Sequence, residues 1–218
     1  MRKFLAFLVF AGFVSAMNLA TAAELWSLGT RDGGNLEFGR KGAAGHWLTF
    51  LEEFPEPVVV RAEDENAVDQ WPKFQPGPTD AWAGNRSHTY TILFDVPDMA
   101  VPEDAKSVQL ILTLSGNPYG APTLSVALND VTRGFTLMGD ADREAQSLIS
   151  LAGTGNARDY TLCFPVDALR EKDNQLTITS TNGSWFAYDA VSMRTSDAAP
   201  IVPVTAGKPF RGEKPADD

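Results

Sequence analysis

Residues 89–96 read TYTILFDV and residues 107–114 read SVQLILTL, and these two stretches decide the fold. Both are rich in β-branched and apolar residues, and Gly, Pro, Asn or Asp residues bound them. Such runs predict β-strands rather than helices. Similar short runs recur along the chain, at residues 58–61, 124–128, 160–164, 176–180 and 190–194. Because no long helical pattern separates them, the runs predict an all-β fold, an antiparallel β-sandwich.

Two regions depart from the strand pattern. Residues 165–170 predict one short helical turn between strands, and residues 142–151 predict another brief helix. Residues 196–218 hold scattered prolines and charges with few apolar residues to bury, which indicates a mostly disordered tail. The sequence thus predicts one β-sandwich domain over residues 23–195.

The chain begins with the pattern of a secretory signal peptide. Arg2 and Lys3 precede an apolar run at residues 4–14, and small residues at 20–22 match a cleavage site. The run is shorter than the ~20 residues of a membrane-spanning helix, and an uncleaved anchor is the alternative. We therefore expect residues 1–22 to be removed and the domain to be secreted or periplasmic, without a membrane partner after cleavage.

Composition restricts the partners and the chemistry. The 28 Asp and Glu residues outnumber the 18 Lys and Arg residues, which argues against nucleic acid, because that partner requires a clustered positive surface. Cys163 is the single cysteine, and its apolar neighbours indicate a core residue rather than a nucleophile. His46 and His88 lie outside any metal-binding motif, so the sequence predicts no catalytic metal or organic cofactor. The acidic run at 63–65 fits a solvated loop, and a glycosidase would need two carboxylates at a separation that a sequence does not reveal.

Aromatic residues are the strongest chemical signal, with five Trp and four Tyr. Trp71 and Trp82 fall among polar, Pro- and Gly-rich residues typical of loops, and Asn85 and Arg86 follow closely. Sugar rings stack their C–H faces on indoles while polar neighbours bind the hydroxyls. The pattern therefore favours carbohydrate binding at Trp71, Trp82, Asn85 and Arg86. The alternative is that the two indoles fill the end of the core.

Several stretches carry a family resemblance. LWSLGTRD at residues 25–32, followed by Leu-Glu-Phe at 36–38, resembles the opening of the C-terminal carbohydrate-binding-like domain of rhamnogalacturonan lyases, polysaccharide lyase family four. Three later stretches resemble the closing strands of that domain, in the same order. They are YTLCFPV at 160–166, NQLTI at 174–178 and WFAYDAV at 185–191. The resemblance implies a jelly-roll β-sandwich of the galactose-binding-like kind. The catalytic lysine and histidine of those lyases belong to a large N-terminal β-domain for which these residues leave no room, so no catalytic residue is carried over.

The resemblance also implies a structural calcium ion, since jelly-roll sugar-binding modules often hold one between an early and a late acidic residue. Here these residues are Glu37 and Asp189, with Asp32 as a third. Carboxylate oxygens are the hard ligands that calcium prefers. The alternative is that Glu37 is an exposed strand residue and that Asp189 caps a turn or accepts hydrogen bonds from backbone amides.

Three functions remain open from the sequence. The first is a secreted, non-catalytic module that binds pectin-like or related polysaccharide. The second is a small polysaccharide lyase or hydrolase, which needs a base and a charge neutraliser such as His88 and Arg86. The third is an extracellular adaptor that binds a protein through the sandwich.

Overall fold

The computed structural model describes residues 22–39, 49–96, 100–116, 122–137, 156–200 and 205–211. The predicted signal peptide up to residue 21, the predicted helix at 142–151 and His46 lie outside these ranges. Within them the chain is mostly β-structure, with two helices, α1 (Phe50–Glu53) and α2 (Ala67–Gln70), and short 3-10 turns. Across the described ranges, no helix has the length and apolar character needed to cross a membrane.

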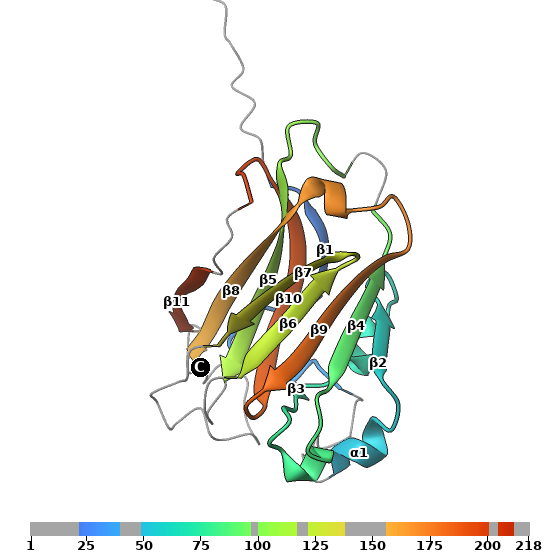
Figure 1. Cartoon of the computed structure of the whole chain (residues 1–218), viewed down its shortest axis with the longest axis vertical. Helices are drawn as coiled ribbons and strands as arrows, with labels where there is room; N and C mark the ends of the chain where they lie inside the picture. The colour runs from blue at the N-terminus through green and yellow to red at the C-terminus, as the bar shows by residue number, and fades with distance from the viewer. Residues whose placement is uncertain are drawn as a thin grey trace, which may run out of the picture.

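Two sheets pack face to face (Figure 1). The six-stranded sheet has the order β1 (Glu24–Gly29), β10 (Phe186–Ser196), β5 (Ser107–Gly116), β8 (Asn156–Pro165) and β11 (Thr205–Arg211), with β3 (Phe74–Gln75) pairing β10. The five-stranded sheet has the order β2 (Val58–Arg61), β4 (Thr89–Phe94), β9 (Asn174–Asn182), β6 (Thr123–Leu128) and β7 (Val131–Thr136). All pairs are antiparallel except β2 with β4. The predicted all-β sandwich is confirmed.

Every strand predicted from the sequence overlaps a strand of the structure, and the 3-10 turn at Val166–Ala168 lies within the predicted helical turn. The sequence pattern does not predict β1, β3, β7 or β11. β3 has only two residues, and β7 contains a charged residue and a glycine that weaken the strand pattern. β11 lies in the segment for which the sequence predicts disorder, and it pairs with β8.

The core lies between the sheets and follows the strand alternation. Val108, Leu110 and Leu112 of β5 point inward opposite Tyr90 and Ile92 of β4, and all five are at most 1% exposed. An apolar interior of this kind supplies most of the folding free energy, at roughly 25 cal/mol per Å² removed from water. Cys163 is also buried, as predicted for a core residue.

A buried glutamine connects the two sheets. The Nε2 of Gln75 donates hydrogen bonds to the carbonyls of His88 (2.7 Å) and Ile178 (2.8 Å), which belong to the five-stranded side. Its Oε1 accepts a hydrogen bond from the Tyr188 hydroxyl on the six-stranded sheet. Because a buried amide without partners is costly, this arrangement fixes the end of the sandwich at which β4 begins.

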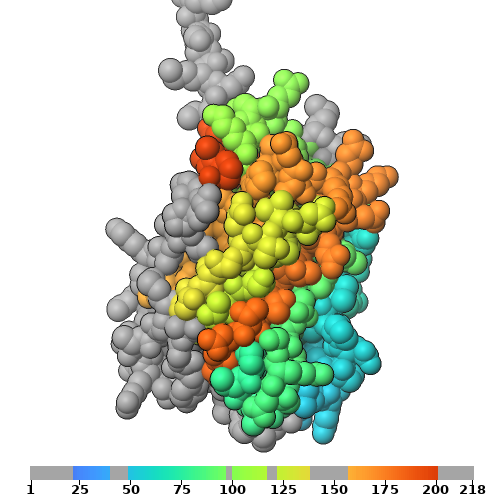
Figure 2. Space-filling model, in the orientation of Figure 1, coloured from blue at the N-terminus to red at the C-terminus, as the bar shows by residue number. Residues whose placement is uncertain are grey.

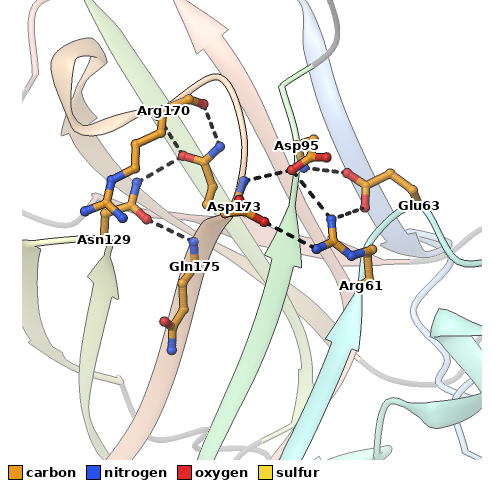
Figure 3. Close-up of polar contacts among 8 residues, drawn as sticks. Arg61, Glu63, Asp95, Asn129, Arg170, Asp173 and Gln175 are labelled. Carbon is orange, nitrogen blue, oxygen red and sulfur yellow. Dashed lines mark hydrogen bonds and ion pairs between the residues drawn. The ribbon is translucent and has the colours of Figure 1, made fainter.

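Charged residues gather at the opposite end of the five-stranded sheet (Figure 3). The guanidinium of Arg61 lies 3.5 Å from the carboxylate of Asp95 and 3.9 Å from that of Glu63. It also lies 3.8 Å from Asp173, whose backbone N–H donates to Asp95. These pairs are exposed and each contributes little stability, and they connect the strand ends of β2, β4 and β9.

Candidate functional site

A pocket of about 360 Å³ opens at the end of the sandwich near α1, where β4 begins. α1 lies at the lower end of the molecule in Figure 1. The pocket is lined by three segments, which are Phe50 and Phe54 of the α1 region, Pro55, Glu56, Pro57 and Val58 leading into β2, and Arg86, Ser87, His88, Thr89 and Tyr90 leading into β4.

Aromatic rings form the apolar part of the pocket. Phe50 and Phe54 lie with their ring centroids 5.5 Å apart. Trp82 packs edge-on behind Phe50 at 5.6 Å and against Phe74 at 5.4 Å. The half-buried Trp82 therefore supports the wall rather than lining it. Such a wall offers an apolar surface to the C–H face of a sugar ring.

His88 contributes a neutral imidazole to the pocket. Its Nε2 lies 2.9 Å from the carbonyl oxygen of Ala83, and because a carbonyl only accepts, Nε2 carries the hydrogen and Nδ1 keeps a lone pair. Burial lowers the pKa of His88 below its ordinary value, and the nearby positive charge of Arg86 lowers it further. His88 is therefore a hydrogen-bond acceptor at neutral pH and not a second cation.

Arg86 brings a positive charge to the same pocket, and Glu56, which also lines it, brings a negative charge. Within the described residues Arg86 has no hydrogen bond or ion pair to the protein. Other exposed arginines are paired, since Arg31 lies 2.6 Å from Asp159 and Arg170 lies 2.9 Å from Asp130. A guanidinium presents a fork of donors that matches a carboxylate. In a chain with 28 acidic residues, this free cation is suited to an anionic ligand.

Two hydrogen bonds to Asp80 hold the loop that leads to Arg86. The buried carboxylate of Asp80 accepts hydrogen bonds from the Gly77 N–H (2.7 Å) and the Ser184 hydroxyl (2.6 Å). A Cβ added at Gly77 would lie 2.2 Å from the carbonyl oxygen of Gly183, so only glycine fits where the loop crosses the β9–β10 turn. A loop ordered before binding loses less entropy when a ligand arrives.

The structure separates the four predicted carbohydrate-binding residues. Trp71 is 0% exposed and packs edge-on against Tyr90 and Tyr188, with centroids 5.3 and 5.4 Å away. An indole without accessible surface has no face for a sugar, so Trp71 is a core residue and not a stacking platform. Its polar sequence neighbours conceal this, because Trp71 directly follows the short helix α2 and turns inward.

The other three predicted residues lie near one another in the chain but play different parts. Asn85 is exposed in a left-handed conformation (φ 50°) and does not line the pocket. Arg86 lines it, and Trp82 lies behind it. Phe50 and Phe54 are not predicted from the sequence, although two aromatic residues close to Pro55 and Pro57 are a signal for them.

The side chains of the two residues predicted to hold calcium accept hydrogen bonds from backbone N–H groups. The Oδ1 of Asp189 accepts hydrogen bonds from the N–H groups of Gly33 (3.0 Å) and Asp32 (3.4 Å), and Glu37 accepts one from the Thr30 N–H (2.7 Å). The Oδ2 of Asp189 is buried without a partner, but no group of three His, Cys, Asp or Glu side chains in the described ranges is arranged to hold a metal. These contacts show carboxylates that hold the loop after β1, and the calcium ion, which would take six to eight oxygens, stays a prediction.

Burial has a consequence for the charge of Asp189. Desolvation raises its pKa from 3.8 to about 7, with smaller increases from the negative charges of Asp32 and Glu37. The backbone amides of Asp32 and Gly33 act in the opposite direction. Asp189 therefore titrates near neutral pH, at the point where β10 meets the turn after β1.

A two-sheet β-sandwich of this kind is consistent with a carbohydrate-binding-type accessory domain. Residues 24–193 match the family described as CBM-like, polysaccharide lyase family 4, domain III, and the chain belongs to this family. The resemblance found in the sequence is thereby confirmed. Among curated proteins, a search with the sequence gives no match.

Proposed function

We propose that this protein is a secreted, non-catalytic module whose pocket binds acidic, pectin-like polysaccharide. The observation that carries the proposal is the guanidinium of Arg86, unpaired within the described residues, beside the Phe50 and Phe54 rings. Membership of a carbohydrate-binding-type family supports the polysaccharide, and the free positive charge supports the carboxylate of a uronate. The leader pattern supports export.

The chemistry of the pocket divides the contacts with a uronate between two kinds of group. The rings of Phe50 and Phe54 pack against C–H groups of the sugar, while Arg86 pairs with its carboxylate. His88 Nδ1 accepts a hydrogen bond from a sugar hydroxyl, because its Nε2 is already used by Ala83. An uncharged sugar would leave the guanidinium without a carboxylate, so we expect the pocket to favour acidic polymer, although Glu56 also lines it.

Calorimetry and affinity electrophoresis with polygalacturonate, rhamnogalacturonan, galactan, arabinan and xylan test this function. We expect the two acidic polymers to bind in the pocket. Phe54→Ala should weaken that binding by about ten- to a hundredfold, which corresponds to about 1–3 kcal/mol for one apolar ring. Leu51→Ala is the matched control, because Leu51 is an exposed apolar residue of α1 that does not line the pocket. Absence of binding to both acidic polymers contradicts the proposal.

A second function is favoured by one specific observation, that His88 and Arg86 line the same pocket. In β-elimination, Nδ1 of His88 would take the proton from the carbon next to the uronate carboxylate while Arg86 neutralises that carboxylate. The C–H electron pair would form a C=C bond, the glycosidic C–O bond on the adjacent carbon would break, and the departing oxygen would take a proton from water. Incubation with polygalacturonate or rhamnogalacturonan, followed by the ultraviolet absorbance of the unsaturated product, tests it. A signal that disappears in His88→Ala would establish a lyase, and a trace equal to the blank would exclude this candidate.

A further inference from the structure

The outer face of the five-stranded sheet is rich in hydroxyl groups. Strand alternation sends Tyr90, Ile178 and Val126 into the core and their neighbours outward. We define the hydroxyl face by outward residues of four strands, which are Thr89 of β4, Thr177, Thr179 and Thr181 of β9, Thr123, Ser125 and Ala127 of β6, and Thr132, Gly134 and Thr136 of β7. The outward Thr91 is buried, and the outward Leu93 and Gln175 lie beyond the face, toward Arg61. These strands face the viewer in Figure 1, and Figure 2 shows their atoms as a continuous surface.

The strand register aligns these residues in rows across the sheet. One row runs from Thr89 through Thr179 and Ser125 to Gly134. Neighbouring strands lie about 4.8 Å apart and alternate residues of a strand about 7 Å apart, so the face covers roughly 14 Å in each direction. That span accommodates two or three sugar rings of an extended polysaccharide chain.

The hydroxyl face carries no charge, although 21% of the whole chain is charged. Charged residues lie at its two ends instead. At one end Arg61 forms the ion pairs drawn in Figure 3, and at the other end Arg86 lines the pocket. Uncharged residues give no counter-charge for an acidic polymer, whereas a neutral polymer buries no unpaired charge against them. The charge distribution therefore suits a neutral ligand.

Gly134 is a second, independent observation on the same face. It lies in the interior of β7, where glycine weakens a strand, and the pairing of β6 with β7 contains no bulge that would require it. Its φ is not among the positive values, and of the residues that the structure describes, a Cβ built there would meet only the Leu124 carbonyl oxygen, at 3.8 Å. Neither conformation nor packing explains the missing side chain. Glycine in a strand interior also marks places where a ligand approaches the backbone closely.

The hydroxyl face is continuous with the pocket. Thr89 lines the pocket, and its Oγ1 lies 2.8 Å from Oγ1 of Thr179 in the middle of the face. Threonine hydroxyls both donate and accept hydrogen bonds, and threonine methyl groups pack against the C–H groups of a pyranose. Because no aromatic ring is present on the face, each contact is weak and affinity depends on repetition along a polymer.

We propose that the hydroxyl face binds a neutral polysaccharide, independently of the acidic ligand of the pocket. Uncharged, insoluble xylan and galactan are the probes, and depletion of the protein from solution is the measurement. Gly134→Gln fills the open position without adding charge, and we expect at least tenfold weaker binding. Thr179→Val removes one hydroxyl at nearly constant shape, and we expect a severalfold loss.

Two controls separate this surface from the pocket and from general effects of substitution. Ser27→Gln places the same side chain on an exposed position of β1, at the outer face of the other sheet, and should leave binding unchanged. Arg86→Gln should reduce binding of polygalacturonate only. Melting temperatures near that of the wild type establish that each variant is folded.

Four results would overturn the proposal. The first is that the wild type binds neither neutral polymer, and the second is that Gly134→Gln and Thr179→Val bind as the wild type does. The third is a concentration-dependent dimer, seen by sedimentation, that Gly134→Gln dissociates, because the face would then be a self-association surface. The fourth is that Arg86→Gln no longer binds the neutral polymers, because their binding site would then be the pocket.

Discussion

The carboxylate of Asp80 accepts a 2.6 Å hydrogen bond from the hydroxyl of Ser184, 104 residues further along the chain. This contact fastens the loop before β4, which carries Arg86, to the turn between β9 and β10. A hydrogen bond between two segments that are far apart in the sequence thus holds the loop beside the pocket.

Asp80→Ala should therefore weaken both folding and binding. The substitution leaves the Gly77 N–H and the Ser184 hydroxyl without their acceptor, at a cost of about 1–3 kcal/mol in the free energy of unfolding. Ser184→Ala removes only one of the two bonds and should cost about 1 kcal/mol. Urea denaturation gives both values, and equal stability of Asp80→Ala and the wild type would show that the loop does not depend on this anchor.

Trp71 and Trp82 should respond differently to truncation. Trp71→Ala leaves a cavity in the core and should lower the free energy of unfolding by about 3–5 kcal/mol. Trp82→Ala should cost less stability, because Trp82 is only partly buried, and should weaken polysaccharide binding by removing the support of Phe50. Thermal melts and calorimetry on both variants distinguish these outcomes. Normal stability of Trp71→Ala would contradict its core position.

Several features of the fold follow from local sequence, and the site does not. Alternation in runs such as 89–96 predicts strands because one face must be buried. Trp71 shows the limit of that reasoning, since its polar, Pro-rich neighbours favour a loop while tertiary packing on Tyr90 and Tyr188 takes the ring inside. The pocket joins residues 50–58 to 86–90 across the parallel pairing of β2 with β4, which no local pattern specifies.

Asp189 should make stability depend on pH between about 4 and 7. Its folded-state pKa, about 7, lies above the ordinary 3.8, so in this range the folded state binds more protons than the unfolded state. The contribution of Asp189 to the free energy of unfolding therefore decreases as pH rises through this range and is lost above pH 7. The full three-unit shift sets an upper limit of about 4 kcal/mol.

Asp189→Asn tests this linkage, because Asn retains an acceptor for the Gly33 N–H and carries no charge. Chemical denaturation at pH 5 and pH 8 should show a smaller pH difference in the variant than in the wild type. The melting temperature should also be unchanged by a calcium chelator, as the backbone contacts of Asp189 and Glu37 suggest. An identical pH difference in both proteins contradicts the raised pKa of Asp189. A fall in melting temperature on addition of the chelator would support the predicted calcium ion.

Removal of the residues after Thr195 should destabilise the domain. The Ser196 carbonyl accepts a hydrogen bond from the Lys106 N–H (2.8 Å), the Ala198 carbonyl accepts one from the Ser107 hydroxyl (2.7 Å), and β11 pairs with β8. The sequence alone predicts instead that the truncation is neutral. Thermal melts of chains ending at residues 195 and 211 decide between the two, and equal melting temperatures would favour the disordered tail.

The most direct test of the account is the affinity of polygalacturonate for the wild type and for Arg86→Gln, measured by calorimetry at low and at moderate salt. We expect wild-type binding that weakens with salt, because it rests on a charge pair. Arg86→Gln should bind about ten- to a hundredfold more weakly and lose most of the salt dependence, while its melting temperature stays unchanged. Wild-type affinity and salt dependence in a folded Arg86→Gln protein would contradict the assignment of this pocket to acidic polysaccharide.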